Sequence, residues 1–233
     1  MEIREHKEPG SGPDNPITNC KSLKESDSQA KSGVYWMKFN ETSSAPFQVF
    51  CDMTTDGGGW TLVYSYTFTK YDYFSHSDNA VTPIPTWPLD FSAYRFVPRS
   101  NTTPINESSH SAIDFALWKK IGSEFLIAPN IINWYACKEG TGSFVNWQPG
   151  TLTCREVKNL IPPRSPNCAL RAPNSISLSA CGVLMKSSSS SKMINLNGRV
   201  DGCYPVHDSC GTGTTTTDHL RNIPNPGGKL YIR

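Results

Sequence analysis

The sequence predicts an α+β fold, with a small β-rich N-terminal subdomain over residues 18–66 and a larger, irregular, loop-rich subdomain that also contains strands. Short runs of β-branched and aromatic residues recur along the chain, and only residues 111–121 have helical periodicity. Long segments rich in Ser, Pro, Asn and Gly separate these runs. We expect residues 18–233 to form one domain, and residues 1–17 to be a flexible leader or tail.

Three consecutive strands are predicted in the N-terminal subdomain. Residues 33–39 (G-V-Y-W-M-K-F) and 47–51 (F-Q-V-F-C) form a predicted hairpin, because the turn-forming residues 40–46 lie between them. The third strand, residues 60–66, follows three consecutive glycines that permit a tight turn. A phosphate-binding loop is not predicted there, since no helix and lysine follow the glycines.

Residues 111–121 form the one predicted helix, because apolar side chains recur on one face and Ser111 with Asp114 resembles a capping box. The apolar face consists of Ile113, Ala116, Leu117 and Ile121. We interpret this face as packing against the core. Further strands are predicted at residues 125–134, 143–147, 176–185 and 229–233, and residues 149–175 are expected to be loop.

Cysteine is the most informative residue type in this chain. The eight cysteines are an even number and include no CxxC pair, which argues against zinc and redox motifs and for four disulfides. Because disulfides persist in oxidising compartments, they indicate a secreted protein. The cysteines are Cys20, Cys51, Cys137, Cys154, Cys168, Cys181, Cys203 and Cys210.

Other sequence features agree with an extracellular location. Three N-x-S/T sequons predict glycosylation at Asn40, Asn101 and Asn106. A formal net charge of +2 without a dense Lys/Arg run argues against a nucleic-acid partner. No window approaches 18 apolar residues, so no membrane span is expected. The sequence leaves the oligomeric state open, homo-oligomers included.

Enzymatic activity is not expected. The chain has no G-x-S-x-G elbow, no H-E-x-x-H motif and no recognisable hydrolase carboxylate pair. A cysteine nucleophile is not expected either, because all eight cysteines can pair. These observations favour a recognition or structural module over a catalyst.

A specific family resemblance lies in the N-terminal subdomain. Residues 33–36 (G-V-Y-W), 50–54 (F-C-D-M-T) and 58–63 (G-G-W-T-L-V) resemble, in this order, the start of a fibrinogen-like domain. The resemblance implies a fibrinogen-like C-terminal-type fold and a bridge between Cys20 and Cys51. Residues 67–180 do not resemble this family, and its acidic calcium-binding run is missing.

Residues 198–213 are similar to the intelectins, which have an R-V-x-G-C stretch, a histidine just before a second cysteine, and a glycine-rich turn. The terminal L-Y-I-R also resembles their closing strand. This resemblance implies a Ca²⁺ site completed by the vicinal diol of a glycan. The implied metal ligands are His207 and Asp218, with Asp201, Asp208 and the hydroxyls of residues 214–217 as further oxygen donors. Because a ligating histidine must be neutral, calcium affinity is expected to fall through the histidine pH range.

The expected function is therefore an extracellular recognition or adhesion module, lectin-like, with calcium-assisted binding of glycans. The alternative is a structural or protein-binding matrix module without metal. In that case His207 and Asp208 form a hydrogen-bonded loop pair, and Asp218 with His219 forms an exposed turn. Residues 220–228 contain no aromatic side chain to wall a sugar as in intelectins.

The disulfide pairing is only partly predicted. A Cys203–Cys210 bridge is expected to hold the short loop that carries His207. The other four cysteines, which lie in the centre of the chain, allow three arrangements, of which we predict the sequential one. These four are Cys137, Cys154, Cys168 and Cys181.

Overall fold

The computed structural model describes residues 7–42, 44–70, 76, 78–89, 95–161, 172–187, 192–200, 203–209 and 218–233. The helices are α1 (Cys20–Ser26), the short 3-10 turn η1 (Thr55–Gly57) and α2 (Phe115–Ile121). The strands are β1 (Gly33–Met37), β2 (Phe47–Asp52), β3 (Trp60–Phe68), β4 (Val81–Thr82), β5 (Arg95–Phe96), β6 (Ser111–Ala112), β7 (Phe125–Pro129), β8 (Trp134–Glu139), β9 (Gly150–Lys158), β10 (Ser175–Ser179), β11 (Gly182–Lys186), β12 (Lys192–Asn197), β13 (Arg199–Val200), β14 (Val206–His207) and β15 (Gly227–Ile232).

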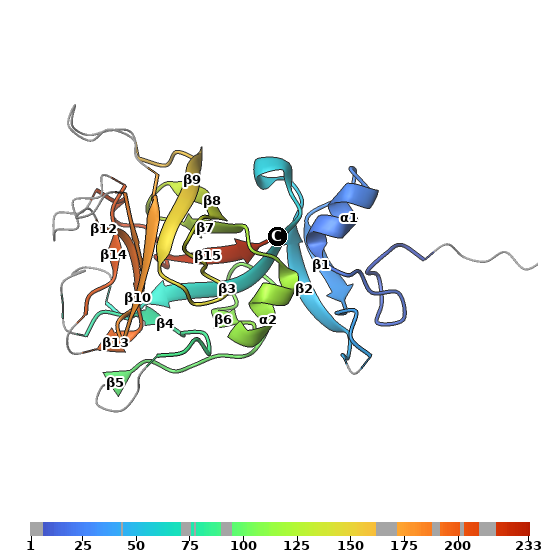
Figure 1. The fold of residues 1–233 in the computed structure, drawn as a ribbon, viewed down its shortest axis with the longest axis horizontal. Helices are drawn as coiled ribbons and strands as arrows, with labels where there is room; N and C mark the ends of the chain where they lie inside the picture. Colours follow the sequence, from blue (N-terminus) through green and yellow to red (C-terminus); the bar gives the residue numbers. More distant parts are fainter. Residues whose placement is uncertain are drawn as a thin grey trace, which may run out of the picture.

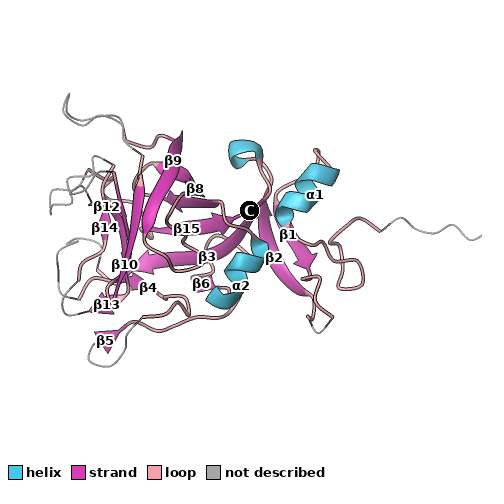
Figure 2. Ribbon diagram, viewed as in Figure 1, coloured by secondary structure: helices cyan, strands magenta, loops and turns pink. Residues whose placement is uncertain are grey.

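Most of these strands join one antiparallel sheet. Its order is β1-β2-β3-β15-β7-β8-β9-β10-β11-β12-β14, with β4 and β6 added to β3, while β5 and β13 pair separately. The described chain is thus mostly β, with two short α-helices (Figure 2), whereas an α+β fold was expected. The expected two-subdomain division stays a prediction; β3, which ends the expected N-terminal subdomain, pairs with β15 and so joins that part of the chain to the rest of the sheet.

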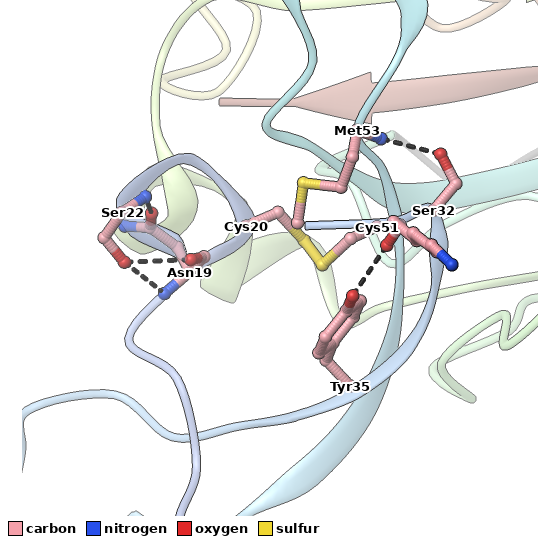
Figure 3. The surroundings of a disulfide bond; sticks show 8 residues. Asn19, Cys20, Ser22, Ser32, Tyr35, Cys51 and Met53 are labelled. Atoms are coloured by element: carbon pink, nitrogen blue, oxygen red, sulfur yellow. Dashed lines mark hydrogen bonds between the residues drawn. A yellow bond between two sulfur atoms is a disulfide. The ribbon is translucent and has the colours of Figure 1, made fainter. Parts of the chain in front are cut away.

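The N-terminal hairpin forms as predicted. β1 and β2 pair from Gly33 with Cys51 to Met37 with Phe47. The implied Cys20–Cys51 disulfide is confirmed, and both cysteines are buried (Figure 3). This bridge joins α1, which the sequence analysis did not predict, to β2. Only Cys20 and Leu23 are buried in this helix, so the sequence shows no repeated apolar face there.

Capping defines where α1 begins. The Ser22 N–H donates to Asn19 Oδ1 at 2.8 Å, and the Asn19 N–H donates to Ser22 Oγ at 3.3 Å, which together form a capping box (Figure 3). Cys20 and Leu23 are the buried residues of the helix. The helix therefore presents the cysteine to β2.

Residues 7–17 differ from the expected flexible leader. The backbone N–H of Ile17 donates to the Trp36 carbonyl at 2.8 Å, and that of Lys38 donates to the Ile17 carbonyl at 2.9 Å. The Trp36 N–H also donates to the Gly10 carbonyl at 2.8 Å. The segment thus occupies the outer edge of β1, because an edge strand offers unpaired backbone groups.

A tight glycine turn positions the first residue of β3. Gly58 has a φ of 78°, and a Cβ at this position would lie 2.2 Å from the Met53 carbonyl oxygen. Only glycine fits such a conformation and approach. The turn also places the Trp60 indole so that its Nε1 donates to the Thr55 carbonyl at 2.8 Å.

The C-terminal strand lies in the middle of the sheet. β15 pairs with β3 on one side and with β7 on the other (Figure 1). The main hydrophobic core includes the large aromatic side chains of Tyr64, Trp87 and Trp118, and a smaller cluster includes Trp60 and Leu126. Because β15 pairs with both β3 and β7, it joins these two strands, which are not neighbours in the sequence, into one sheet.

An ion-pair network holds the end of β15. The Arg233 guanidinium donates from Nη1 to the carbonyls of Asp56 and Gly58, both at 2.9 Å. Its Nε and Nη2 donate to the Glu124 carboxylate, both at 3.1 Å, and its Cζ lies 4.0 Å from the centroid of a Trp60 ring. Arg233 thus links the glycine turn, β3 and the residue before β7.

The predicted helix is shorter than expected. α2 begins at Phe115, and its N-cap is Asp114, whose side chain accepts from the Ala116 N–H at 3.0 Å. Ser111 is instead part of β6, where it pairs with Ser65 of β3. Residues 111–112, which were predicted to begin the helix, therefore pair with β3 instead.

Several loops and strands also differ from the prediction. Residues 143–147, a predicted strand, form a turn closed by mutual backbone hydrogen bonds between Ser143 and Gln148. The strand predicted over residues 176–185 is the hairpin β10–β11, in which Ser179 pairs with Gly182. The loop expected at residues 149–175 contains β9, which pairs along its length with β8. In the two segments that form strands, antiparallel pairing with a neighbouring strand is what extends or divides the predicted element.

Candidate functional site

The candidate metal-binding region lies at the end of the sheet opposite α1 (Figure 1). There β14 pairs with β12, and His207 is opposite Ile194 in the register. The next backbone bond runs from the Asp208 N–H to the Met193 carbonyl at 2.8 Å. His207 and Asp208 are therefore held by the sheet, and both are buried.

The His207 side chain lies in an aromatic environment. Its Nε2 shares a hydrogen bond of 2.7 Å with the Tyr66 hydroxyl, and its ring meets the Phe68 ring edge-on at a centroid distance of 4.9 Å. Burial and, to a smaller extent, the nearby His219 lower the pKa of His207 to about 3, against the opposing effect of a backbone hydrogen bond at Val206. His207 is therefore neutral at the pH values at which an exposed histidine becomes charged.

Two of the predicted acidic ligands are brought together. The Asp218 N–H donates to Asp208 Oδ1 at 3.4 Å, and the Ser209 N–H donates to the Asp218 carbonyl at 3.3 Å. Asp208 is buried and Asp218 is half-buried. These bonds bring the Asp218 backbone next to the Asp208 carboxylate, although the two residues are ten positions apart in the sequence.

The remaining predicted ligands cannot be placed. Asp201 and the threonines of residues 214–217 lie outside the described residues. Within the described part of the chain, no group of three or more His, Cys, Asp or Glu side chains is arranged to hold a metal ion. The calcium site therefore stays a prediction, and Asp208 and Asp218 are the two predicted acidic ligands that the structure brings close together.

The disulfides correct two predicted pairings. Cys137–Cys154 forms as predicted, whereas Cys181 pairs with Cys203. This pairing contradicts the expected Cys203–Cys210 bridge and the sequential partner of Cys181, which was Cys168. The structural reason lies in the pairing of β11 with β12. Gly182, which follows Cys181, pairs with Asn197. The Asn197 Nδ2 donates to the Cys203 carbonyl at 2.5 Å, which holds Cys203 near Cys181. Cys168 and Cys210 lie outside the described residues.

The three predicted glycosylation sites have exposed asparagines. Asn106 Oδ1 accepts from the Ser108 N–H at 2.9 Å, and Asn40 lies in the loop between β1 and β2. Exposure is required for glycan attachment. Glycosylation at Asn40, Asn101 and Asn106 stays a prediction.

The sequence analysis did not predict the aromatic partners of His207. Tyr66 lies 141 positions away along the chain, and the hydrogen bond is made possible by the position of β3 within the sheet. The β-branched and aromatic residues of positions 60–66 indicated that Tyr66 lies in a strand, but no local signal names its partner. Tyr66 is fully buried, and this burial raises its pKa well above the usual value.

The chain is similar to known proteins over its N-terminal part. Residues 17–78 match the family of fibrinogen beta and gamma chains, C-terminal globular domain. The chain is 28% identical to mouse Tenascin-N over 111 residues, which is 42% of this chain and 7% of that protein. It is 33% identical to human Angiopoietin-related protein 1 over 64 residues, which is 28% of this chain and 13% of that protein.

These matches confirm the fibrinogen-like resemblance for residues 17–78, which include all three predicted N-terminal strands. The matched part of the chain spans only a small fraction of the two relatives' length. The similarity of residues 198–213 to the intelectins stays a prediction. None of the helices within the described ranges is long and apolar enough to cross a membrane.

Proposed function

We propose that this chain is a non-enzymatic extracellular recognition or adhesion module that binds a protein partner. The observation that carries the proposal is the fibrinogen-like similarity of residues 17–78 together with the buried Cys20–Cys51 disulfide. Tenascin and angiopoietin-related proteins, to which the chain is similar, support an extracellular site of action. The three disulfides among the described residues agree with an oxidising compartment.

The fold is suited to recognition because its loops are held by a cross-linked sheet. Cys137–Cys154 joins β8 to β9, and Cys181–Cys203 ties the β10–β11 turn to the segment before β14. Binding through preorganised loops avoids part of the entropy cost of ordering them. This rigidity favours a module that presents a surface to a partner.

Adhesion can be tested on coated surfaces. Surfaces coated with the folded chain are expected to retain matrix-producing cells several times better than surfaces coated with the reduced and alkylated chain. Treating the cells with protease is expected to abolish retention, because the proposed partner is a protein. Equal retention on both surfaces would contradict the proposal, and loss after glycosidase treatment alone would favour a glycan partner.

A second candidate is calcium-assisted glycan binding at the C-terminal segment. The adjacency of Asp208 and Asp218 favours it, since Ca²⁺ prefers carboxylate and carbonyl oxygens and tolerates irregular geometry. In this proposal both aspartates hold the ion, and a sugar diol completes its coordination. The Nε2 of His207 is already bonded to Tyr66, so His207 contributes as a neutral neighbour and not through that nitrogen.

Calcium binding can be measured on the purified chain. If the proposal is correct, a free Ca²⁺ concentration of about 100 times the dissociation constant raises the free energy of unfolding by about 2.7 kcal/mol. The double variant Asp208→Asn, Asp218→Asn is expected to lose this response, and Asp78→Asn, at an exposed position, is the matched control. An unchanged melting temperature in calcium and in chelator would leave the metal-free protein-binding module as the function.

A further inference from the structure

A pocket of about 300 Å³ lies beside the first sequon. Pro16 and Thr18 line one side of it, and residues 38–42 line the other. Both the glycan acceptor Asn40 and the sequon residue Thr42 are among the lining residues. The pocket is at the lower end of the size range for small-molecule sites, which suits a single sugar ring.

Backbone hydrogen bonds hold the two sides of the pocket together. The Lys38 N–H donates to the Ile17 carbonyl at 2.9 Å, and the Ile17 N–H donates to the Trp36 carbonyl at 2.8 Å. The pocket therefore spans the junction between residues 16–18 and the end of β1. A ligand that contacts both sides stabilises this junction.

The lining combines an apolar residue, Phe39, with polar residues. Phe39 is 7% exposed and packs against Phe47 at a ring-centroid distance of 5.6 Å. Thr18 and Lys38 add polar groups to the lining. A pyranose ring has one apolar face and several hydroxyls, so such a lining matches it.

The sequon itself is accessible and locally ordered. Asn40 is exposed, and the turn after it is closed by the Ser44 N–H, which donates to the Glu41 carbonyl at 3.1 Å. The Glu41 carboxylate also accepts from Lys120 Nζ at 2.8 Å. A glycan on Asn40 thus starts from a fixed point at the edge of the pocket.

We propose that Asn40 carries an N-linked glycan whose first N-acetylglucosamine occupies this pocket and clamps residues 16–18 to the end of β1. In the attachment step, Asn40 Nδ2 bonds to C1 of a lipid-linked oligosaccharide. The C1–O bond breaks, its electron pair leaves with the lipid diphosphate, and one amide proton is lost. This inference is independent of the partner that the chain binds.

The test uses the chain secreted from animal cells that make only oligomannose glycans. Glycopeptide mapping establishes whether Asn40 is occupied. One sample is trimmed with an endoglycosidase that leaves a single N-acetylglucosamine, and another is fully deglycosylated. Hydrogen exchange is then compared at the Ile17 and Lys38 amides, which make the junction bonds. We expect the single-sugar form to keep the slow exchange, and the sugar-free form to exchange roughly tenfold faster at both amides.

Two variants distinguish the effect of the sugar on amide exchange from the effect of the Asn40 side chain itself. Asn40→Gln and Thr42→Ala both remove the glycan by different changes, so both are expected to reproduce the fast exchange. Asn101→Gln, which removes a predicted glycan elsewhere, is the matched control and should leave both amides unchanged. An unoccupied Asn40 in the secreted chain, or equal exchange in the single-sugar and sugar-free forms, would overturn the proposal.

Discussion

Replacing Cys20 and Cys51 together with alanine is expected to lower the free energy of unfolding by about 3–4 kcal/mol. The bridge closes a loop with a sequence separation of 31, and removing it lets the unfolded chain gain conformational entropy. For a chain of this length, the melting temperature should fall by roughly 10 °C. Denaturant unfolding of the oxidised protein measures the change.

A nearby variant distinguishes the cross-link from local packing. Ser32→Ala removes only the hydrogen bond from the Met53 N–H to Ser32 Oγ, which is 2.8 Å long and lies beside the disulfide (Figure 3). We expect it to cost about 1 kcal/mol. If the double cysteine variant costs no more than Ser32→Ala, the bridge does not hold the N-terminal hairpin. Non-reducing peptide mapping should first confirm the Cys20–Cys51 pairing.

Arg233→Ala is the second variant with a large expected effect. The Arg233 side chain is only 15% exposed, and its loss leaves two backbone carbonyls without this donor and removes the fork that binds Glu124. Removing one partner of a largely buried pair is strongly destabilising, and partial exposure reduces the cost here to about 2–3 kcal/mol. Thermal and denaturant unfolding measure it.

Arg155→Ala is the matched control for Arg233. Arg155 forms ion pairs with Asp56 and Glu124 in the same network, but its side chain is 43% exposed. Solvent screening weakens such pairs, so we expect a loss below about 1 kcal/mol. Equal losses in the two variants would contradict the central role given to Arg233.

The network also predicts a sensitivity to acid. Burial opposes ionisation of Glu124, but hydrogen bonds and charge from Arg233, and then from Arg155, lower its pKa below the usual 4.5. The folded pKa is below the unfolded one, so this stabilisation is present above about pH 4.5 and is lost as pH falls through the folded value. Arg233→Ala should therefore lose less stability on acidification than the unsubstituted chain.

Local patterns predicted the N-terminal hairpin and β3 well. The β-branched and aromatic residues and the turn residues between positions 33 and 66 act over a few neighbours, and the β1–β2 pair forms in the expected order. The Cys20–Cys51 bridge came from the family resemblance. By contrast, residues 111–112 have a helical pattern but join β3, because a sheet partner far away along the chain competes with local propensity.

The candidate site was predicted only in part. The sequence indicated that His207, Asp208 and Asp218 belong to one region, and the hydrogen bonds that join Asp208 and Ser209 to Asp218 agree. It did not predict that Tyr66 and Phe68 surround His207. It also assigned Cys203 to the wrong partner, because the shortest loop was favoured over a bridge set by the register of β11 and β12.

The sequence by itself predicted disulfide bonding, a strand-rich composition and the fibrinogen-like resemblance of the N-terminal part, since cysteines and local motifs carry that information. Only the tertiary structure decided that β15 lies between β3 and β7, that Cys181 bonds Cys203, and that Arg233 closes the network with Glu124. The physical reason is range: propensities and turns depend on adjacent residues, whereas these contacts depend on the order of strands in the whole sheet.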